Sequence, residues 1–194
     1  MSKLPTVAII GQANVGKSSL FNRLTRSRTA IVAREAGTTR DNVVGKVSYK
    51  RRNVDSTPSD DYSQFWLIDT AGLKTAEDEF EATIQDQIAD ASAAADVILV
   101  TVDSTVYPSD TDRQLAKKAL KSGKPVILIA NKADLKGSLS IDEFKRLGIK
   151  TIIKTSAEHN IGISELLDSI AELIPPATET APDDIIRVAL IGRP

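Results

Sequence analysis

A short glycine-containing motif near the N-terminus constrains the fold of this chain more than any other feature. Residues 11–18 read Gly-Gln-Ala-Asn-Val-Gly-Lys-Ser and fit G-x-x-x-x-G-K-[ST], the pattern of a phosphate-binding loop. The run before it, residues 6–10, is short, apolar and β-branched, which is typical of a buried parallel strand, and residues 19–24 have helical character. Strand, loop and helix in this order favour a phosphate site over a glycine-rich turn with a surface lysine.

The chemistry of the motif explains its residue types. Gly11 and Gly16 allow backbone angles that a side chain would forbid, so the loop N–H groups can turn inward around an anion. We expect Lys17 to reach the terminal phosphates and the Ser18 hydroxyl to bind Mg²⁺. The residues of this segment expected to contact the nucleotide are Gly11, Gln12, Ala13, Asn14, Val15, Gly16, Lys17, Ser18 and Ser19.

Composition narrows the class of protein. A chain of 194 residues with 41% hydrophobic residues suits one compact domain with a real core and leaves room for an appendage. The net charge of −1 offers no electrostatic case for DNA or an anionic membrane as primary partner. There is no cysteine, and no apolar run is long enough for a signal peptide or a membrane span, so we expect a cytoplasmic protein.

The rest of the chain predicts an α/β fold. Apolar runs at 97–102, 126–130 and 151–154 alternate with helical patterns, which implies parallel strands joined by right-handed crossovers. Residues 43–49 and 65–68 flank a hydrophilic stretch, 51–63, which we interpret as the exposed loop of an antiparallel hairpin. We therefore expect a mostly parallel six-stranded sheet with one antiparallel strand and helices on both faces.

Two helix starts are predicted from local patterns. Residues 109–112 resemble a helix N-terminus, and Ser140 followed by Glu143 predicts a capping box for a short helix.

Polar motifs follow several of the expected strands. Residues 69–72 read Asp-Thr-Ala-Gly, residues 131–134 read Asn-Lys-Ala-Asp, and residues 155–157 read Thr-Ser-Ala. The carboxyl ends of parallel strands meet at one edge of the sheet, and in open α/β sheets ligands bind at that edge. We expect Asp69 to lie near Mg²⁺, and the Gly72 N–H to meet the γ-phosphate.

The second and third motifs favour guanine over adenine. The Asp134 carboxylate can accept two hydrogen bonds from guanine N1–H and N2–H₂, a pair of donors that adenine lacks. Asn131 can contact N7, the Lys132 stem can lie over the ring, and the Ala157 N–H can donate to O6. The nucleotide-contacting residues predicted beyond the phosphate loop are Asp69, Thr70, Ala71, Gly72, Leu73, Asn131, Lys132, Asp134, Ser156 and Ala157.

Together these motifs resemble the translation-factor-related GTPases, in which a P-loop G domain binds GTP or GDP with Mg²⁺. The resemblance implies that Thr39, within Gly-Thr-Thr-Arg-Asp at 37–41, binds Mg²⁺ together with Ser18 and Asp69. Leu73 occupies the position of the water-orienting glutamine of Ras-like proteins and cannot orient water. In several members with a hydrophobic residue there, the asparagine matching Asn14 helps bind K⁺; the alternative is that Asn14 only stabilises the loop.

Residues 188–192, Val-Ala-Leu-Ile-Gly, repeat the pattern of residues 7–11. With this repeat the chain resembles the Der (EngA) family, which has two G domains joined by an acidic linker. We therefore expect a G domain at 1–174, a linker at 175–184 and the first strand of a second G domain at 185–194. Gln12-Ala13 departs from the family's Arg-Pro, which Arg193-Pro194 shows. The stretch at 51–63 is also longer than expected for this family.

The resemblance implies slow GTP hydrolysis in assembly of the large ribosomal subunit, with a second G domain as partner in cis. It assigns catalytic roles to Lys17, Thr39, Gly72 and Asn14. The alternatives are the G domain of a tRNA-modification, Era-like or iron-transport GTPase, or a module that binds GTP or GDP with little hydrolysis.

Overall fold

The computed structural model describes residues 4–26, 32–34, 43–52, 58–69, 93 and 95–174. Its elements are β1 (Thr6–Gly11), α1 (Lys17–Arg26), β2 (Val32–Arg34), β3 (Val43–Arg52), β4 (Pro58–Asp69), β5 (Val97–Asp103), α3 (Asp110–Lys121), β6 (Val126–Asn131), α4 (Ile141–Phe144), the 3₁₀ helix η1 (Lys145–Leu147), β7 (Thr151–Lys154) and α5 (Ile163–Leu173). Thr39, residues 70–73, the linker and the repeat at 185–194 lie outside the described residues.

The strands form one sheet in the order β2-β3-β4-β1-β5-β6-β7. Strand β3 runs antiparallel to both of its neighbours, while β4, β1, β5, β6 and β7 pair in parallel. The expected mostly parallel α/β sheet with one antiparallel strand is confirmed. The short edge strand β2 adds a seventh strand to the six that the sequence predicted.

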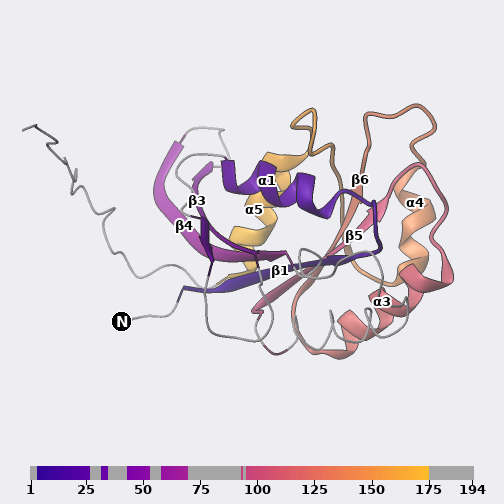
Figure 1. Ribbon diagram of the computed structural model, residues 1–194, viewed down its shortest axis with the longest axis horizontal. Helices are drawn as coiled ribbons and strands as arrows, with labels where there is room; N and C mark the ends of the chain where they lie inside the picture. The colour runs from indigo at the N-terminus through magenta and orange to yellow at the C-terminus, as the bar shows by residue number, and fades with distance from the viewer. Residues whose placement is uncertain are drawn as a thin grey trace, which may run out of the picture.

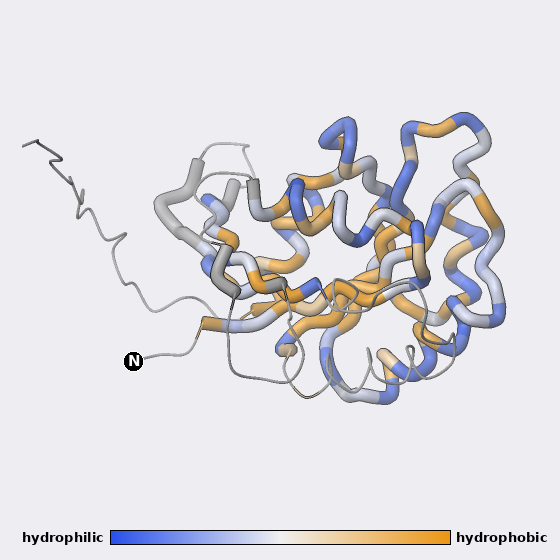
Figure 2. Tube along the Cα trace, viewed as in Figure 1, coloured by the Kyte–Doolittle hydropathy of each residue, from blue (hydrophilic) through white to orange (hydrophobic). Residues whose placement is uncertain are grey.

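Helices cover both faces of the sheet, as Figure 1 shows. On one face, buried residues of α1 and α5 pack against alternate residues of the strands, and α3, α4 and η1 pack on the opposite face. The central strands β1 and β5 are buried along almost their whole length because both of their faces are covered. Figure 2 shows the result as a hydrophobic centre with hydrophilic outer segments.

The hydrophilic stretch at 51–63 is not the long exposed loop that we predicted. Strand β3 continues to Arg52 and β4 begins at Pro58, with Tyr49 opposite Ser63 and Lys50 opposite Tyr62. The prediction failed because it used side-chain polarity alone. In an antiparallel hairpin each strand satisfies the backbone groups of the other, so polar residues can extend the ladder.

The two predicted helix starts have different outcomes. Ser109 caps α3 in a complete capping box, in which Ser109 and Asp112 bond each other's backbone N–H groups. The Ser140 side chain makes no capping hydrogen bond, so that capping box is wrong. Helix α4 is only one turn long and continues as a 3₁₀ helix, and the Glu143 N–H donates to the Ser140 carbonyl instead. None of the described helices is long and apolar enough to cross a membrane.

Candidate functional site

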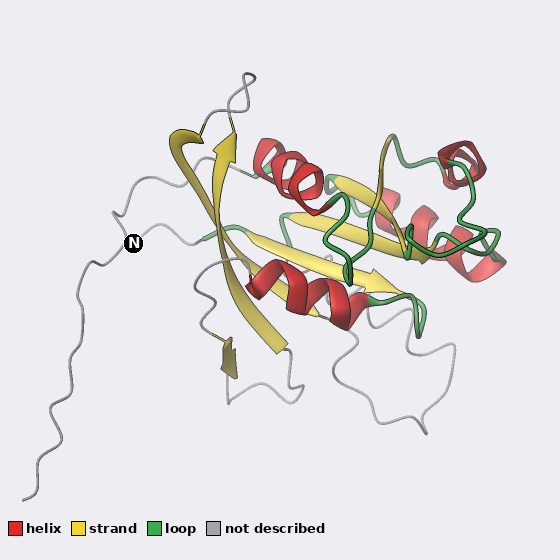
Figure 3. Ribbon diagram, turned by 90° about the horizontal axis from the view of Figure 1, so that it is seen from above, coloured by secondary structure: helices red, strands yellow, loops and turns green. Residues whose placement is uncertain are grey.

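The predicted site residues that the structure describes gather at the carboxyl edge of the sheet. Strand β1 lies between β4 and β5. The strands that follow β1 in the chain are therefore added first on one side of it and later on the other. Such a switch point opens a crevice outside the strand ends. Gly11, Asp69 and Asn131 end β1, β4 and β6, and Thr155 follows β7. Figure 3 shows the parallel strands, with a short loop joining β1 to α1.

The phosphate loop depends on close backbone approach. Gly16 has φ +94°, and a Cβ atom there would overlap the Asn131 amide nitrogen. A Cβ atom at Gly11 would overlap the Thr101 carbonyl oxygen. Asn14, which is exposed, has φ +64°, a left-handed conformation that asparagine adopts more readily than most residues. The glycines of the motif are thus required by neighbouring strands β5 and β6 as well as by the turn itself.

Lys17 is held inside the loop. Its side chain is buried, and Nζ donates to the Gln12 carbonyl at 2.5 Å. Burial lowers the pKa of Lys17, and the charge of Asp69 opposes that effect. A buried ammonium aimed at the loop carbonyls is an electrostatic site for an anion.

Of the predicted Mg²⁺ ligands, Ser18 and Asp69 lie within the described residues. The Ser18 hydroxyl donates to Asp69 Oδ2 at 3.1 Å, so a hydroxyl and a buried carboxylate lie together beside the loop. Oxygen ligands of this kind, completed by phosphate and water, suit Mg²⁺. Within the described residues there is no cluster of three or more histidine, cysteine, aspartate or glutamate side chains that could hold a metal on its own. This pair therefore fits Mg²⁺ that arrives with a nucleotide.

Asn131 joins the loops around the expected base. Its Nδ2 donates to the Val15 carbonyl at 3.0 Å. Its Oδ1 accepts from Thr155 Oγ1 at 3.1 Å and from the Ala157 N–H at 3.2 Å. The structure thus uses Asn131 and Ala157, predicted to contact N7 and O6, in a buried connection between the phosphate loop and the loop after β7.

Lys132 lies beside this connection in a strained conformation. It has φ +66°, unusual for a lysine, and such backbone strain persists where surrounding contacts hold it. Its Nζ forms a 2.6 Å ion pair with Asp103 Oδ2. Burial raises the pKa of Asp103, but hydrogen bonds from Lys132 and Thr105 outweigh this effect and lower it. The sequence indicated no role for Asp103.

Asp134 is ionised and close to the loop after β7. A hydrogen bond from the Ser156 side chain lowers the pKa of Asp134. Its Oδ2 also lies 3.4 Å from Nε2 of His159, a largely exposed residue. A carboxylate kept ionised at neutral pH can accept the paired N–H donors that guanine presents.

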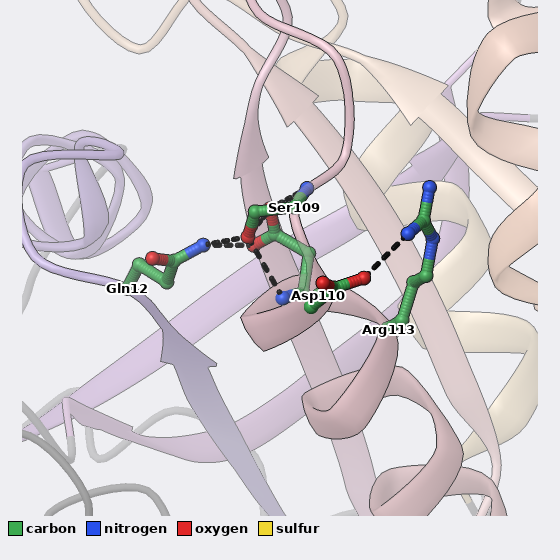
Figure 4. A network of polar contacts seen from close by, with 5 residues as sticks. Gln12, Ser109, Asp110 and Arg113 are labelled. Carbon is green, nitrogen blue, oxygen red and sulfur yellow. Dashed lines mark hydrogen bonds and ion pairs between the residues drawn. The ribbon is translucent and has the colours of Figure 1, made fainter.

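Two further contacts were not predicted. Gln12 Nε2 donates to Ser109 Oγ at 2.8 Å and to Asp112 Oδ1 at 2.7 Å, which ties the phosphate loop to the start of α3 (Figure 4). Arg23 of α1 donates to two carbonyls of the loop after β7. Sequence patterns describe local segments, and these contacts join segments about a hundred residues apart or more.

The fold and the arrangement of its loops define the class: this is a P-loop G domain, the nucleotide-binding unit of GTPases. The sequence pattern of the family described as 50S ribosome-binding GTPase matches residues 6–132. The chain belongs to this family.

Relatives agree with the predicted resemblance to Der. The chain is 40% identical to GTPase Der of Gemmatimonas aurantiaca in an alignment 194 positions long, which covers 98% of the chain and 41% of that protein. It is 40% identical over 192 residues to GTPase Der of Porphyromonas gingivalis, covering 97% of the chain and 41% of the relative. The resemblance to Der G domains is confirmed, and the chain spans about two fifths of the length of these relatives.

Solved structures show the same fold. A variant of Era from Aquifex aeolicus, bound to GDP and AlF₄⁻, matches with TM-score 0.66 and 27% identity over 97% of this chain and 63% of that one. The G domain of the T. maritima FeoB iron transporter matches with TM-score 0.62 and 25% identity over 88% of this chain and 99% of that one.

Proposed function

We propose that this G domain binds GTP with Mg²⁺, hydrolyses it slowly, and serves as a switch in assembly of the large ribosomal subunit. The observation that carries the proposal is the convergence of Lys17, the Ser18–Asp69 pair and the Asn131 connection at one edge of the sheet. Lys17 would contact the phosphates, Ser18 and Asp69 would hold Mg²⁺, and Asp134 would select guanine. Thr39, Thr70, Ala71, Gly72 and Leu73 would complete the site.

The proposed ribosomal role rests on the similarity of the chain to Der proteins. Identity to the Der proteins is near 40% over almost the whole chain, against 27% for Era and 25% for the FeoB G domain. This difference favours a Der-type G domain, with a second G domain in cis after the linker, over an Era-like, iron-transport or tRNA-modification host. Continuation of the parent gene after Gly192-Arg193-Pro194 into a second phosphate loop would support the tandem arrangement.

Hydrolysis in this domain needs a substitute for the water-orienting glutamine and the arginine finger that other GTPases use. Leu73 cannot position water, so the isolated domain is expected to hydrolyse GTP at about 10⁻⁴–10⁻³ s⁻¹ without help. Asn14 is exposed at the phosphate loop, where its side-chain oxygen is available to hold a monovalent cation against the phosphates. A K⁺ ion there would supply positive charge to the transition state, as an arginine finger does in other GTPases.

Phosphate release in KCl and NaCl at equal ionic strength tests this proposal. We expect K⁺ to raise the wild-type rate about tenfold or more over Na⁺. Asn14→Ala should remove the difference while GTP affinity stays within about threefold. Lys17→Ala is the control that should not bind GTP, because it lacks the buried ammonium. Titration calorimetry measures this loss of binding.

The outcomes separate the alternatives. Equal wild-type rates in the two salts would exclude the cation mechanism and leave Asn14 as a residue that stabilises the loop. GTP binding without measurable hydrolysis in either salt would support a binding module. Unchanged GTP affinity in Lys17→Ala would overturn the phosphate site itself.

A further inference from the structure

Arg23 connects the helix after the phosphate loop to the loop expected to read the base. It lies on α1, which begins at Lys17. Its Nε donates to the Ala157 carbonyl and its Nη2 to the Glu158 carbonyl, both at 2.6 Å. Charge-assisted hydrogen bonds of this length are among the stronger ones in proteins. Neither the nucleotide motifs nor the capping patterns assign a role to this residue.

These two bonds fix the orientation of consecutive peptide groups. In a planar trans peptide the carbonyl and the following N–H point in opposite directions. With the Ala157 and Glu158 carbonyls turned toward Arg23, the N–H groups of Glu158 and His159 point away from it. The His159 N–H accordingly donates to Ser156 Oγ at 3.1 Å. The preceding Ala157 N–H donates to Asn131 Oδ1, on the side of the base-reading residues.

A rigid two-pronged donor suits this task. The guanidinium fork presents two N–H groups in a plane and can hold two neighbouring carbonyls at once, whereas a lysine ammonium is a single point on a flexible stem. Arg23 is partly buried between α1 and the loop. Removing it would leave two carbonyls without their donor and free the peptides 157–158 and 158–159 to rotate.

We propose that Arg23 is a positioning residue for guanine recognition. It holds the loop at 155–158 so that the Glu158 N–H faces the oxygen at position 6 of the base. The other three backbone N–H groups of this loop donate to acceptors within the protein. The inference rests on the proposed base site, in which Asp134 reads N1–H and N2–H₂ and the loop reads O6. It predicts that Arg23 controls discrimination at position 6 alone, without contacting the nucleotide.

Three nucleotides distinguish recognition of O6 by the loop from recognition of the 2-amino group by Asp134. GDP presents both edges of guanine. In 6-thio-GDP the O6 acceptor is replaced by sulfur, a weaker hydrogen-bond acceptor, while N1–H and the 2-amino group remain. IDP keeps O6 and N1–H but lacks the 2-amino group that Asp134 would bind. The affinity ratio of GDP to 6-thio-GDP therefore reports the loop, and the ratio of GDP to IDP reports Asp134.

The experiment measures the affinities of all three nucleotides, by titration calorimetry with Mg²⁺, for the full chain and its variants. In Arg23→Ala we expect GDP affinity to fall about three- to tenfold, the worth of one hydrogen bond, while 6-thio-GDP affinity changes less than about twofold. The preference for GDP over IDP should remain. Arg23→Lys should lie between wild type and Arg23→Ala, since an ammonium on a flexible stem holds two neighbouring carbonyls less rigidly than the planar guanidinium does.

Arg113→Ala is the matched control, because Arg113 is an exposed arginine on α3 whose partner is Asp110, three residues before it. All ratios should be unchanged in that variant. Hydrogen exchange of residues 155–160 without nucleotide gives a second readout and should accelerate in Arg23→Ala. If Arg23→Ala does not fold, the ratios in Arg23→Lys decide the question.

Two kinds of result would overturn the inference. If Arg23→Ala weakens all three nucleotides equally, or leaves the ratio of GDP to 6-thio-GDP unchanged, Arg23 only supports the fold. The same holds if wild type does not distinguish GDP from 6-thio-GDP. A wild-type chain that does not prefer GDP over IDP overturns the proposed base site itself, and the inference with it.

Discussion

At the scale of single residues, the ion pair between Lys132 and Asp103 holds the side chain of a proposed nucleotide-contacting residue in place. The lysine adopts a left-handed backbone conformation, and its ammonium is drawn back to the end of β5. Asp103 accepts from the backbone N–H and the hydroxyl of Thr105 as well, so its own position is set by three donors. The aliphatic stem of Lys132 is thereby restrained beside the expected base.

We expect Lys132→Met to raise the pKa of the Asp103 carboxyl, because burial then acts without the opposing lysine. In wild type this pKa is lowered, so the ion pair contributes stability above pH 3.8 and loses it as the pH falls below that value. Both side chains are partly exposed, so the contribution at pH 7 should be about 1 kcal/mol or less.

Carboxyl NMR titration and urea unfolding at pH 7 and pH 3 check this prediction. Lys145→Met, which removes an exposed pair with Asp142, is the control and should change stability by no more than about 0.5 kcal/mol. A stability difference between Lys132→Met and wild type that is as large at pH 3 as at pH 7 would contradict the assignment.

At the scale of secondary-structure elements, helix α3 and the phosphate loop share one set of hydrogen bonds. Ser109 and Asp112 cap the helix, and the same two side chains accept the Gln12 amide (Figure 4). Gln12 makes this connection with a neutral amide donor. The phosphate loop is therefore anchored to an element outside the nucleotide motifs.

We expect Ser109→Ala and Gln12→Ala each to lower the free energy of unfolding by about 1 kcal/mol, through loss of a cap and of a hydrogen-bonded donor respectively. Because they share partners, the double variant should lose measurably less than the sum of the single losses. Urea unfolding of the four proteins measures this coupling. Pairing Gln12→Ala with Arg113→Ala is the control, and additive losses in the Ser109 cycle would rule out the shared network.

At the scale of the whole molecule, the described sheet and both of its helical layers lie within residues 4–174. Among the residues that the structure describes, the two buried clusters, one on each face, extend from Val7 to Ile174. We therefore propose that residues 1–174 form a complete G domain. Residues 175–184 would link it to a second G domain, whose first strand would lie at 185–194.

A chain ending at Ile174 should fold and bind GDP like the full chain. We expect its Tm to change by no more than about 3 °C, since the described residues of both buried clusters are all kept, and its GDP affinity to stay within about twofold. Calorimetry of both chains measures these values. As the opposing control, a chain ending at Asn160, which lacks α5 and its buried face, should not fold. Loss of folding in the chain ending at Ile174 would contradict the proposed domain boundary.

Much of the fold could be predicted from the sequence because it is encoded locally. Apolar runs marked β1, β5, β6 and β7 within a residue or so, and polar motifs at strand ends marked the edge of the sheet where a ligand would bind. These signals depend on hydrophobic periodicity and on backbone angles within a few residues, both of which one segment carries by itself. The strand extensions into 51–63 were missed because their stabilisation comes from the opposite strand.

The connections between the motifs were decided by tertiary structure. Gly16 must be glycine because Asn131, on another strand, occupies the space of its side chain, and Asn131 in turn holds Val15 and Ala157. Arg23, Gln12 and Asp103 gain their roles only where distant segments meet. A sequence pattern states which groups are present, but the partner of a buried donor is chosen by whichever acceptor the fold brings within about 3 Å.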